Sequence, residues 1–409
     1  MSHRQVKHLN VLDFIFSVLV ILECETIWKW SYTNTYRFRL LIVGAMLACS
    51  LIFVLVRSKI LIKSIQYILY LLLLTVISYF LYNTYYYELI MFVIPAISII
   101  SYTMNCEKSD LFLLCKNISN IMLIIAFVSV VMYYFCSIRG TLQPTGIFQI
   151  TRNSSAVNVD SYYNIYYSVQ RTSFFGNIVA RNCAFFYEAP KFILLLNFSL
   201  IFELFYRGKI SWFRVVVFYI TLATTLSVSG ICAGIIIIFV KFMLTKTHSK
   251  ATRAYKVIFA IAVGFITIYV FNIFIDMKLS TSSGETRLDD YRAGILAWLD
   301  SPLFGVGIGN MSSIYSHFGS SRESSNIGFS NSLFRILSQG GLMLMAFYLY
   351  PIICGIKKAI RNGVWDCIFL ICIFLYLFIT VSFPYNAICI LWLVLISRSI
   401  CSEGNIVIE

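Results

Sequence analysis

The sequence has few charged residues and lacks the short motifs of several common enzyme classes. Charged residues make up 12% of its 409 residues, about half of the roughly 25% that soluble domains carry. No P-loop, HExxH or GxSxG pattern occurs, and the 12 cysteines lie mostly in apolar runs, without the spacing of zinc ligands or of a disulfide framework. The composition therefore excludes an ordinary soluble domain, and we expect neither a metal site nor a cofactor.

Long apolar runs fill the chain instead. Hydrophobic residues make up 59% of it, and nearly uncharged windows of about 20 residues, the length that crosses a bilayer, recur from end to end. We predict an all-α, polytopic integral membrane protein with a single membrane domain over residues 1–409. Its first apolar run is interpreted as a transmembrane helix and not as a removed signal peptide. About twelve transmembrane helices are expected, at 11–28, 40–56, 65–83, 88–104, 119–137, 191–206, 213–226, 231–245, 256–275, 334–354, 366–381 and 386–400.

The basic residues set the predicted topology. The formal net charge is +14, but lysine and arginine lie in short clusters between apolar runs, so we predict no nucleic-acid partner. With both termini cytoplasmic, the short opposite loops at 84–87, 227–230 and 382–385 contain no lysine or arginine, as the positive-inside rule requires. The loop at 29–39 is an exception. This orientation places two long segments outside the cytoplasm, at 138–190 and 277–333.

Both long segments contain arginines, although they lie on the side where the positive-inside rule predicts few. These arginines have two interpretations. Long loops are translocated regardless of charge, or the arginines bind an anionic ligand, because guanidinium pairs bidentately with phosphate. Arg287 and Arg292 stand in a stretch with helical apolar spacing, at Tyr291, Ile295 and Trp298. There they could grip two oxygens of one pyrophosphate, or pair with Asp289 and Asp290 as surface salt bridges.

Four sequence blocks carry a resemblance to a known family. Ser301 to Asn310 reads SPLFGVGIGN, with glycines at 305, 307 and 309 that permit positive φ and close backbone approach. Arg181 to Pro190 reads RNCAFFYEAP, Thr225 to Gly230 reads TLSVSG, and Ser330 to Leu333 reads SNSL, followed by Gly340 and Gly341. Together these blocks resemble the O-antigen ligase and polymerase superfamily, although Ala189 interrupts the Glu-Pro element of the second block.

The resemblance implies a metal-independent membrane glycosyltransferase that uses undecaprenyl-diphosphate-linked oligosaccharides. Arginines would neutralise the charge that grows on the leaving diphosphate, and a carboxylate would accept the proton of the acceptor hydroxyl. The expected catalytic residues are Arg287, Arg181 and Glu188, and the expected substrate-binding residues are Arg292, Asn310, Ser330, Asn331 and Asp289. Asp289 and Asp290 are further candidates for the base, and His317 is an alternative.

One difference from the family pattern bears on whether the chain is a ligase or a polymerase. Ligases typically have a histidine just before the asparagine of the last block, and this chain has Ser330, which is no base near neutral pH. We therefore predict a polymerase of surface-polysaccharide repeat units in the bacterial inner membrane, with its active site facing the periplasm. A ligase that transfers polysaccharide to a lipid A core and a flippase of the lipid-linked oligosaccharide are the alternatives. The bilayer and a chain-length regulator protein are expected partners.

Two other groups of residues, four tyrosines and two glutamates, are considered for the site but have a structural explanation. Tyr162, Tyr163, Tyr166 and Tyr167 would form one aromatic stripe on a helix, which suits sugar stacking but better suits an interfacial helix. Glu25 lies four residues before Lys29, so these two residues are expected to pair with each other. Glu25 and the nearby Glu23 are therefore left out of the predicted site.

Overall fold

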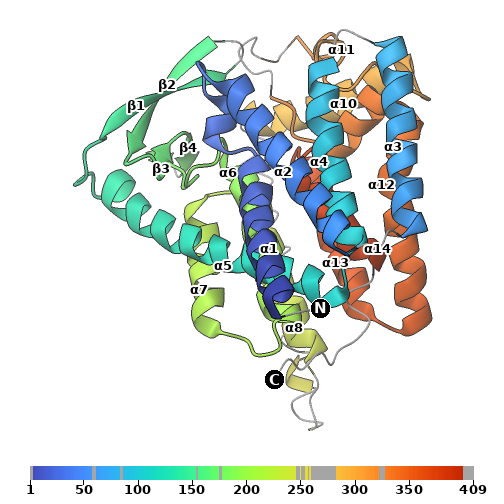
Figure 1. The fold of residues 1–409 in the computed structure, drawn as a ribbon. Coiled ribbons are helices and arrows are strands. Elements are labelled where there is room, and N and C mark those ends of the chain that lie inside the picture. The colour runs from blue at the N-terminus through green and yellow to red at the C-terminus, as the bar shows by residue number, and fades with distance from the viewer. Residues whose placement is uncertain are drawn as a thin grey trace.

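The protein is a bundle of helices with a small β structure at one end (Figure 1). The structure, a computed structural model, describes residues 3–57, 61–82, 86–152, 155–174, 177–245, 249, 254–256, 258, 282–320, 322 and 328–398. The bundle helices are α1 (His3–Glu23), α2 (Thr35–Arg57), α3 (Ile62–Leu81), α4 (Tyr86–Met104), α5 (Lys108–Met132), α6 (Ala189–Ile201), α7 (Trp212–Thr224), α8 (Val228–Leu244), α12 (Ser332–Asn362), α13 (Trp365–Thr380) and α14 (Ala387–Arg398). The π-helical turns η3 (Tyr133–Ile138) and η4 (Phe202–Tyr206) extend α5 and α6.

Six segments of the described chain are long and apolar enough to cross a membrane: Tyr36–Arg57, Ile62–Leu81, Tyr86–Met104, Lys108–Ile138, Ala189–Tyr206 and Ser332–Asn362. The helices α7, α8, α13 and α14 are apolar but shorter. These helices confirm a polytopic membrane protein. The predicted span at 256–275 lies almost entirely outside the described residues, so the count of twelve and the cytoplasmic termini stay predictions.

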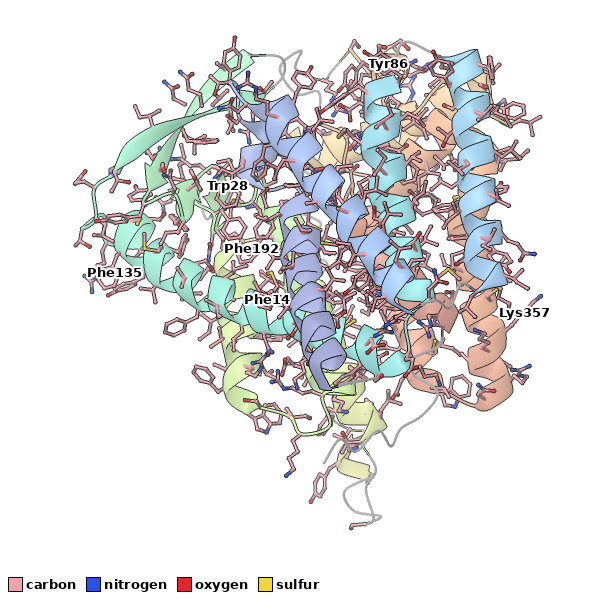
Figure 2. The ribbon with its side chains drawn as sticks, viewed as in Figure 1. Phe14, Trp28, Tyr86, Phe135, Phe192 and Lys357 are labelled. Atoms are coloured by element: carbon pink, nitrogen blue, oxygen red, sulfur yellow. The ribbon has the colours of Figure 1, made fainter. Side chains whose placement is uncertain are left out.

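Burial separates inner helices from outer ones. Along α14 nearly every side chain from Ala387 to Ile396 is buried, as expected for a helix that is apolar on all sides and surrounded by protein. In α3, Ile62 and Phe80 are 73% and 80% exposed, which suits a lipid-facing helix. Figure 2 shows Lys357, near the end of α12, at the opposite end of the bundle from Tyr86.

The first long segment forms strands, which the all-α prediction did not include. Strands β1 (Gly146–Arg152), β2 (Ser155–Tyr162) and β3 (Tyr166–Ser168) form an antiparallel sheet in that order. Strands β4 (Arg171–Phe174) and β5 (Asn177–Ala180) form a separate hairpin. The first sheet joins the connection after α1 through a bridge between Ser31 and Ile150, next to the short helix η1 (Ile27–Trp30).

The predicted helical tyrosine stripe is therefore wrong. Tyr163 and Asn164 have φ of 53° and 57°, as the two central residues of a type I′ turn do, and Ile165 N closes the turn by donating to the carbonyl of Tyr162 at 3.1 Å. Tyr162 and Tyr166 stand opposite each other on β2 and β3, with ring centroids 5.9 Å apart. Tyrosine is a favourable residue in strands, and asparagine is a favourable residue in turns with positive φ. Both preferences support a hairpin in this segment.

The second long segment contains α10 (Ser282–Asp300) and the short α11 (Ser312–Tyr315), at the same end of the bundle as β1 and β2 (Figure 1). The predicted helix is thus confirmed. Ala293 and Ala297 are buried against Ile314, whereas Ile295 is 39% exposed. Small side chains form this face because α10 lies close to α12: a Cβ at Gly294 would be 2.6 Å from the Cβ of Phe334.

Candidate active site

The glycine-rich block lies against a break in α12. Gly341 has φ 60° and ψ −161°, so α12 consists of two helical pieces on either side of it. The block supplies the missing hydrogen bonds: Val306 N and Gly307 N donate to the carbonyls of Ser338 and Gln339 at 2.9 and 3.0 Å. Past the break, Leu342 N and Met343 N donate to the carbonyls of Pro302 and Leu303 at 2.9 and 3.1 Å. Non-helical backbone is tolerated within a membrane protein where protein groups satisfy it.

The glycines make this contact possible. Gly305, Gly307 and Gly309 have φ of 67°, 105° and 92°, which confirms the prediction of positive φ. A Cβ at Gly305 would lie 2.3 Å from the carbonyl carbon of Gln339, and one at Gly341 would lie 2.4 Å from that of Leu303. The block therefore fixes the first piece of α12, which carries Arg335.

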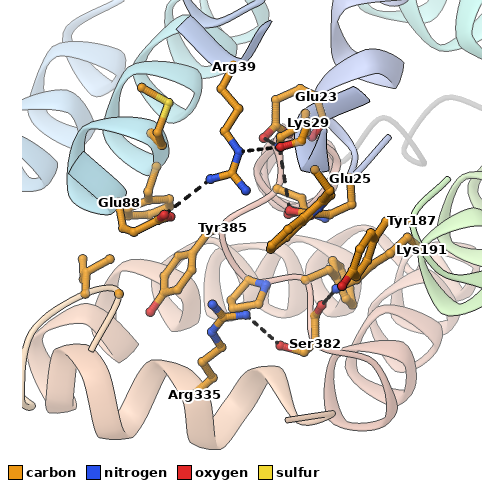
Figure 3. Close-up of a pocket in the computed structure, with 18 of the residues that line it drawn as sticks. Glu23, Glu25, Lys29, Arg39, Glu88, Tyr187, Lys191, Arg335, Ser382 and Tyr385 are labelled. Carbon is orange, nitrogen blue, oxygen red and sulfur yellow. Dashed lines mark hydrogen bonds and ion pairs between the residues drawn. The ribbon is translucent and has the colours of Figure 1, made fainter. Parts of the chain in front are cut away.

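A cavity of about 370 Å³ lies beside this first piece of α12. It collects side chains from the end of α1, from η1, α2, α4 and the start of α6, from the glycine-rich block and from the α13–α14 connection (Figure 3). Among its lining residues are Glu23, Glu25, Lys29, Trp30, Arg39, Glu88, Tyr187, Glu188, Lys191, Gly309, Tyr315, Arg335, Ser382 and Tyr385.

One wall of the cavity is a set of ion pairs. Lys29 Nζ lies 2.9 Å from Glu23 Oε1 and 3.7 Å from Glu25 Oε1, which confirms the expected pairing of Glu25 with Lys29. Glu23 Oε2 also accepts a hydrogen bond from Ala387 N at 2.6 Å, at the start of α14. Burial alone would raise the pKa of Glu25, but Lys29 and other nearby cations outweigh it and lower this pKa to about 2. Glu25 is thus an ionised carboxylate and a weak base near neutral pH.

The opposite wall is cationic. Lys191, in the first turn of α6, donates to the carbonyl of Ser382, and Arg335 Nη1 donates to Ser382 Oγ at 3.3 Å. The Arg335 guanidinium lies over the ring of Tyr385, 5.2 Å from its centroid. Tyr385 in turn donates its hydroxyl to Gln339 Oε1 at 2.7 Å. Figure 3 shows Arg335 and Lys191 reaching Ser382 from different helices.

Of the three predicted catalytic residues, only Glu188 lines the cavity. Glu188 lines the cavity at the N-cap position of α6, and its carboxylate forms no hydrogen bond with a described residue. Arg181 Nε donates to the carbonyl of Thr225 at 2.9 Å. Burial lowers the pKa of Arg181, Glu188 opposes this shift, and the charge of Arg287 adds to it. Arg181 therefore lies within electrostatic range of both Glu188 and Arg287.

The predicted substrate-binding residues lie outside this cavity lining. Arg292 is exposed on α10. Asn310 Oδ1 accepts a hydrogen bond from Ser312 Oγ at 2.6 Å, next to α11. Asn331 is buried at the N-cap of α12, where its Oδ1 accepts from Phe334 N at 3.0 Å.

The acidic pair on α10 has a partner other than the predicted ones. Arg322 Nη1 lies 3.2 Å from Asp289 and 2.8 Å from Asp290, in place of the expected pairing with Arg287 and Arg292. Ser330 donates its hydroxyl to Asp290 Oδ2 at 2.7 Å. These contacts hold the chain before α12 onto α10.

His317 pairs instead with Asp300, at 2.7 Å, and does not line the cavity. Several cavity residues were not predicted: Glu23, Glu25, Lys29, Arg39, Glu88, Lys191 and Arg335. For two of these residues, their position next to a family-like block is a weak indication in the sequence. Lys191 directly follows the 181–190 block, and Arg335 lies two residues after the SNSL block.

Comparison with known families supports the resemblance. Residues 213–349 match the O-antigen ligase family, a region that begins in α7 and ends in α12 and contains the glycine-rich block and Arg335. No curated protein matches the chain. The match supports the O-antigen ligase and polymerase superfamily and an enzyme of the ligase or polymerase type, and it does not distinguish the two activities.

Proposed function

We propose that this protein is a glycosyltransferase that joins undecaprenyl-diphosphate-linked oligosaccharide repeat units into O-antigen or a related surface polysaccharide. In this reaction a hydroxyl of one repeat unit attacks the anomeric carbon of a growing chain. The bond from that carbon to the diphosphate oxygen breaks, and undecaprenyl diphosphate leaves. We further propose that the cavity faces the periplasm from the inner membrane.

Glu188 carries this proposal. Glu188 lines the cavity, and its carboxylate has no hydrogen-bond partner among the described residues, so it is free to accept the proton of the attacking hydroxyl. Glu25, by contrast, is held as an ion-paired carboxylate with a pKa of about 2. The position of Glu188 within range of Arg181 also suits a base that acts beside the leaving group.

Arg181 and Arg287 are the proposed partners of the leaving diphosphate. Their like charges lie close enough for Arg287 to lower the pKa of Arg181, so an anion between them would relieve repulsion. Guanidinium groups bind phosphate oxygens bidentately and stabilise the charge that develops on the leaving group. This chemistry proceeds with protein groups alone.

Ser330 favours a polymerase over a ligase. At the position where ligases typically have histidine, the Ser330 hydroxyl is engaged as a donor to Asp290, so it offers no base there. The proton acceptor must then come from another residue, which Glu188 supplies. We infer that the acceptor is a second lipid-linked repeat unit, with a chain-length regulator protein as a further partner.

The test uses cells that lack this gene and express single variants. Glu188→Gln should lower the rate of chain extension by about 10²-fold or more, and Arg287→Ala should abolish polymer. Protein levels in the membrane should stay near normal. Arg361→Ala, at the exposed end of α12, is the matched control and should support normal polymer. Normal polymer length from Glu188→Gln would refute the assigned base, and normal length from Arg287→Ala would refute the diphosphate contact.

A further inference from the structure

The charges of the cavity do not all pair with each other. Among the described residues, Glu23 and Glu25 pair with Lys29, and Arg39 pairs with Glu88 at 3.4 Å. Two cavity cations have no described carboxylate within ion-pair distance. These are Arg335 and Lys191, and Lys191 still lies within electrostatic range of Glu25 and Glu188. Arg335 is therefore the least compensated cation of the cavity.

Arg335 is also incompletely hydrogen-bonded. Its Nε is buried and has no partner among the described residues, and its Nη1 has only the 3.3 Å contact with Ser382 Oγ. A buried donor of a charged group without a partner is costly. The guanidinium carbon lies 5.2 Å from the ring centroid of Tyr385, and the unpartnered Nε leaves hydrogen-bonding capacity for a bidentate anion.

Helix ends add to the positive potential at this wall. Arg335 lies in the first turn of α12 and Lys191 in the first turn of α6. The N-terminus of a helix carries partial positive charge, so both cations reinforce the ends from which they project. The break at Gly341 and the glycine-rich block fix the first of these ends in place.

This cationic wall is separate from the Arg181 and Arg287 pair. Arg335 and Lys191 line the cavity, whereas Arg181 and Arg287 do not. Glu188 lines the cavity as well, and it lies within electrostatic range of both Arg181 and Lys191. Among the described cavity residues, the one carboxylate without an ion pair is thus influenced by both cationic groups.

We propose that Arg335, with Lys191, forms a second anion-binding position that takes a phosphate group of the second substrate. This inference rests on the proposed function, in which donor and acceptor each carry a lipid-linked diphosphate. The Arg181 and Arg287 pair then holds the diphosphate that leaves, and Arg335 with Lys191 holds the diphosphate that stays. Glu188, within electrostatic range of Arg181 and of Lys191, takes the proton of the acceptor hydroxyl.

The test is a titration of the purified full-length protein in detergent with inorganic pyrophosphate, followed by calorimetry. Wild-type protein should bind two pyrophosphates. Arg335→Gln and Arg287→Gln should each bind one, and the double variant none. The exposed Arg361→Gln control should bind two. Two pyrophosphates bound by Arg335→Gln with wild-type affinity would overturn the second position.

Arg335→Lys tests the same idea if the glutamine variant unfolds, which its thermal melting would show. Lysine retains the charge but loses the bidentate fork, so pyrophosphate should bind at the second position at least tenfold more weakly. Unchanged affinity at both positions would overturn the proposal. Pyrophosphate binding does not depend on turnover, so the two proposals can fail separately. If wild-type protein binds two pyrophosphates but cells that lack the gene still make normal polymer, the proposed function is refuted and the second anion-binding position stands.

Discussion

The contact between Gly305 and the break in α12 gives a sharp prediction. Gly305→Ala places a Cβ 2.3 Å from the carbonyl carbon of Gln339, at a φ of 67°. Left-handed backbone alone costs an alanine roughly 1 to 2 kcal/mol. The contact with backbone cannot be relieved by a rotamer change, so the block must move away from α12.

This movement would break the hydrogen bonds from Val306 N and Gly307 N to the first piece of α12. Each lost buried bond costs about 1 to 3 kcal/mol, so Gly305→Ala should destabilise the protein by about 3 kcal/mol or more beyond the left-handed strain. Gly140→Ala is the matched control, because Gly140 has φ 62° and a Cβ added there would meet no described atom within 4 Å. It should therefore show the strain alone.

The assay is thermal unfolding of both purified variants in detergent, together with polymer length in cells. Tm should fall clearly further for Gly305→Ala than for Gly140→Ala, and only Gly305→Ala should shorten the polymer, because it displaces Arg335. Equal losses of Tm in the two variants would show that the block does not support α12, and the reasoning would be wrong.

Three further predictions concern stability. Arg322→Gln leaves the buried Asp290 without its cation and should cost about 3 to 5 kcal/mol; the region around α10 should become more sensitive to protease, and unchanged proteolysis would contradict the pairing. Asn331→Ala removes the cap of α12 and should cost about 0.5 to 2 kcal/mol, whereas Asn331→Asp should retain most of it; equal Tm values would show that the cap is unimportant. The lowered pKa of Glu25, about 2 against 4.5, means that its ion pairing stabilises the fold above about pH 4.5 and is lost as pH falls toward 2. Below pH 4.5 the Tm of wild-type protein should therefore fall faster than that of Glu25→Gln, and parallel profiles would refute this assignment.

Local features of this fold were predictable from the sequence. Apolar length predicts the membrane helices, since the hydrocarbon core sets how many residues must cross it. The glycines at 305, 307 and 309 predict positive φ because other residues avoid it. In the first long segment, the spacing of the tyrosines is compatible with a helix as well as with strands. The left-handed backbone at Tyr163 and Asn164 forms a turn, and this turn makes the segment a hairpin.

The cavity was not predictable, because distant segments form it. Glu23 meets Ala387, and Lys191 and Arg335 meet at Ser382. A single sequence contains no information on which helix ends converge. For the same reason the sequence suggested only the nearby Arg287 and Arg292 as possible partners of Asp289, although Arg322 pairs with it from another part of the segment.

The electrophoretic profile of surface lipopolysaccharide from cells that lack this gene tests the central claim most directly. A polymerase leaves flipping and ligation intact, so the account predicts lipid A cores that each carry a single repeat unit. Bare cores, with polymer accumulating on the lipid carrier outside the cytoplasm, would identify a ligase. Bare cores with single units trapped on the cytoplasmic face would identify a flippase, and either result would contradict the account.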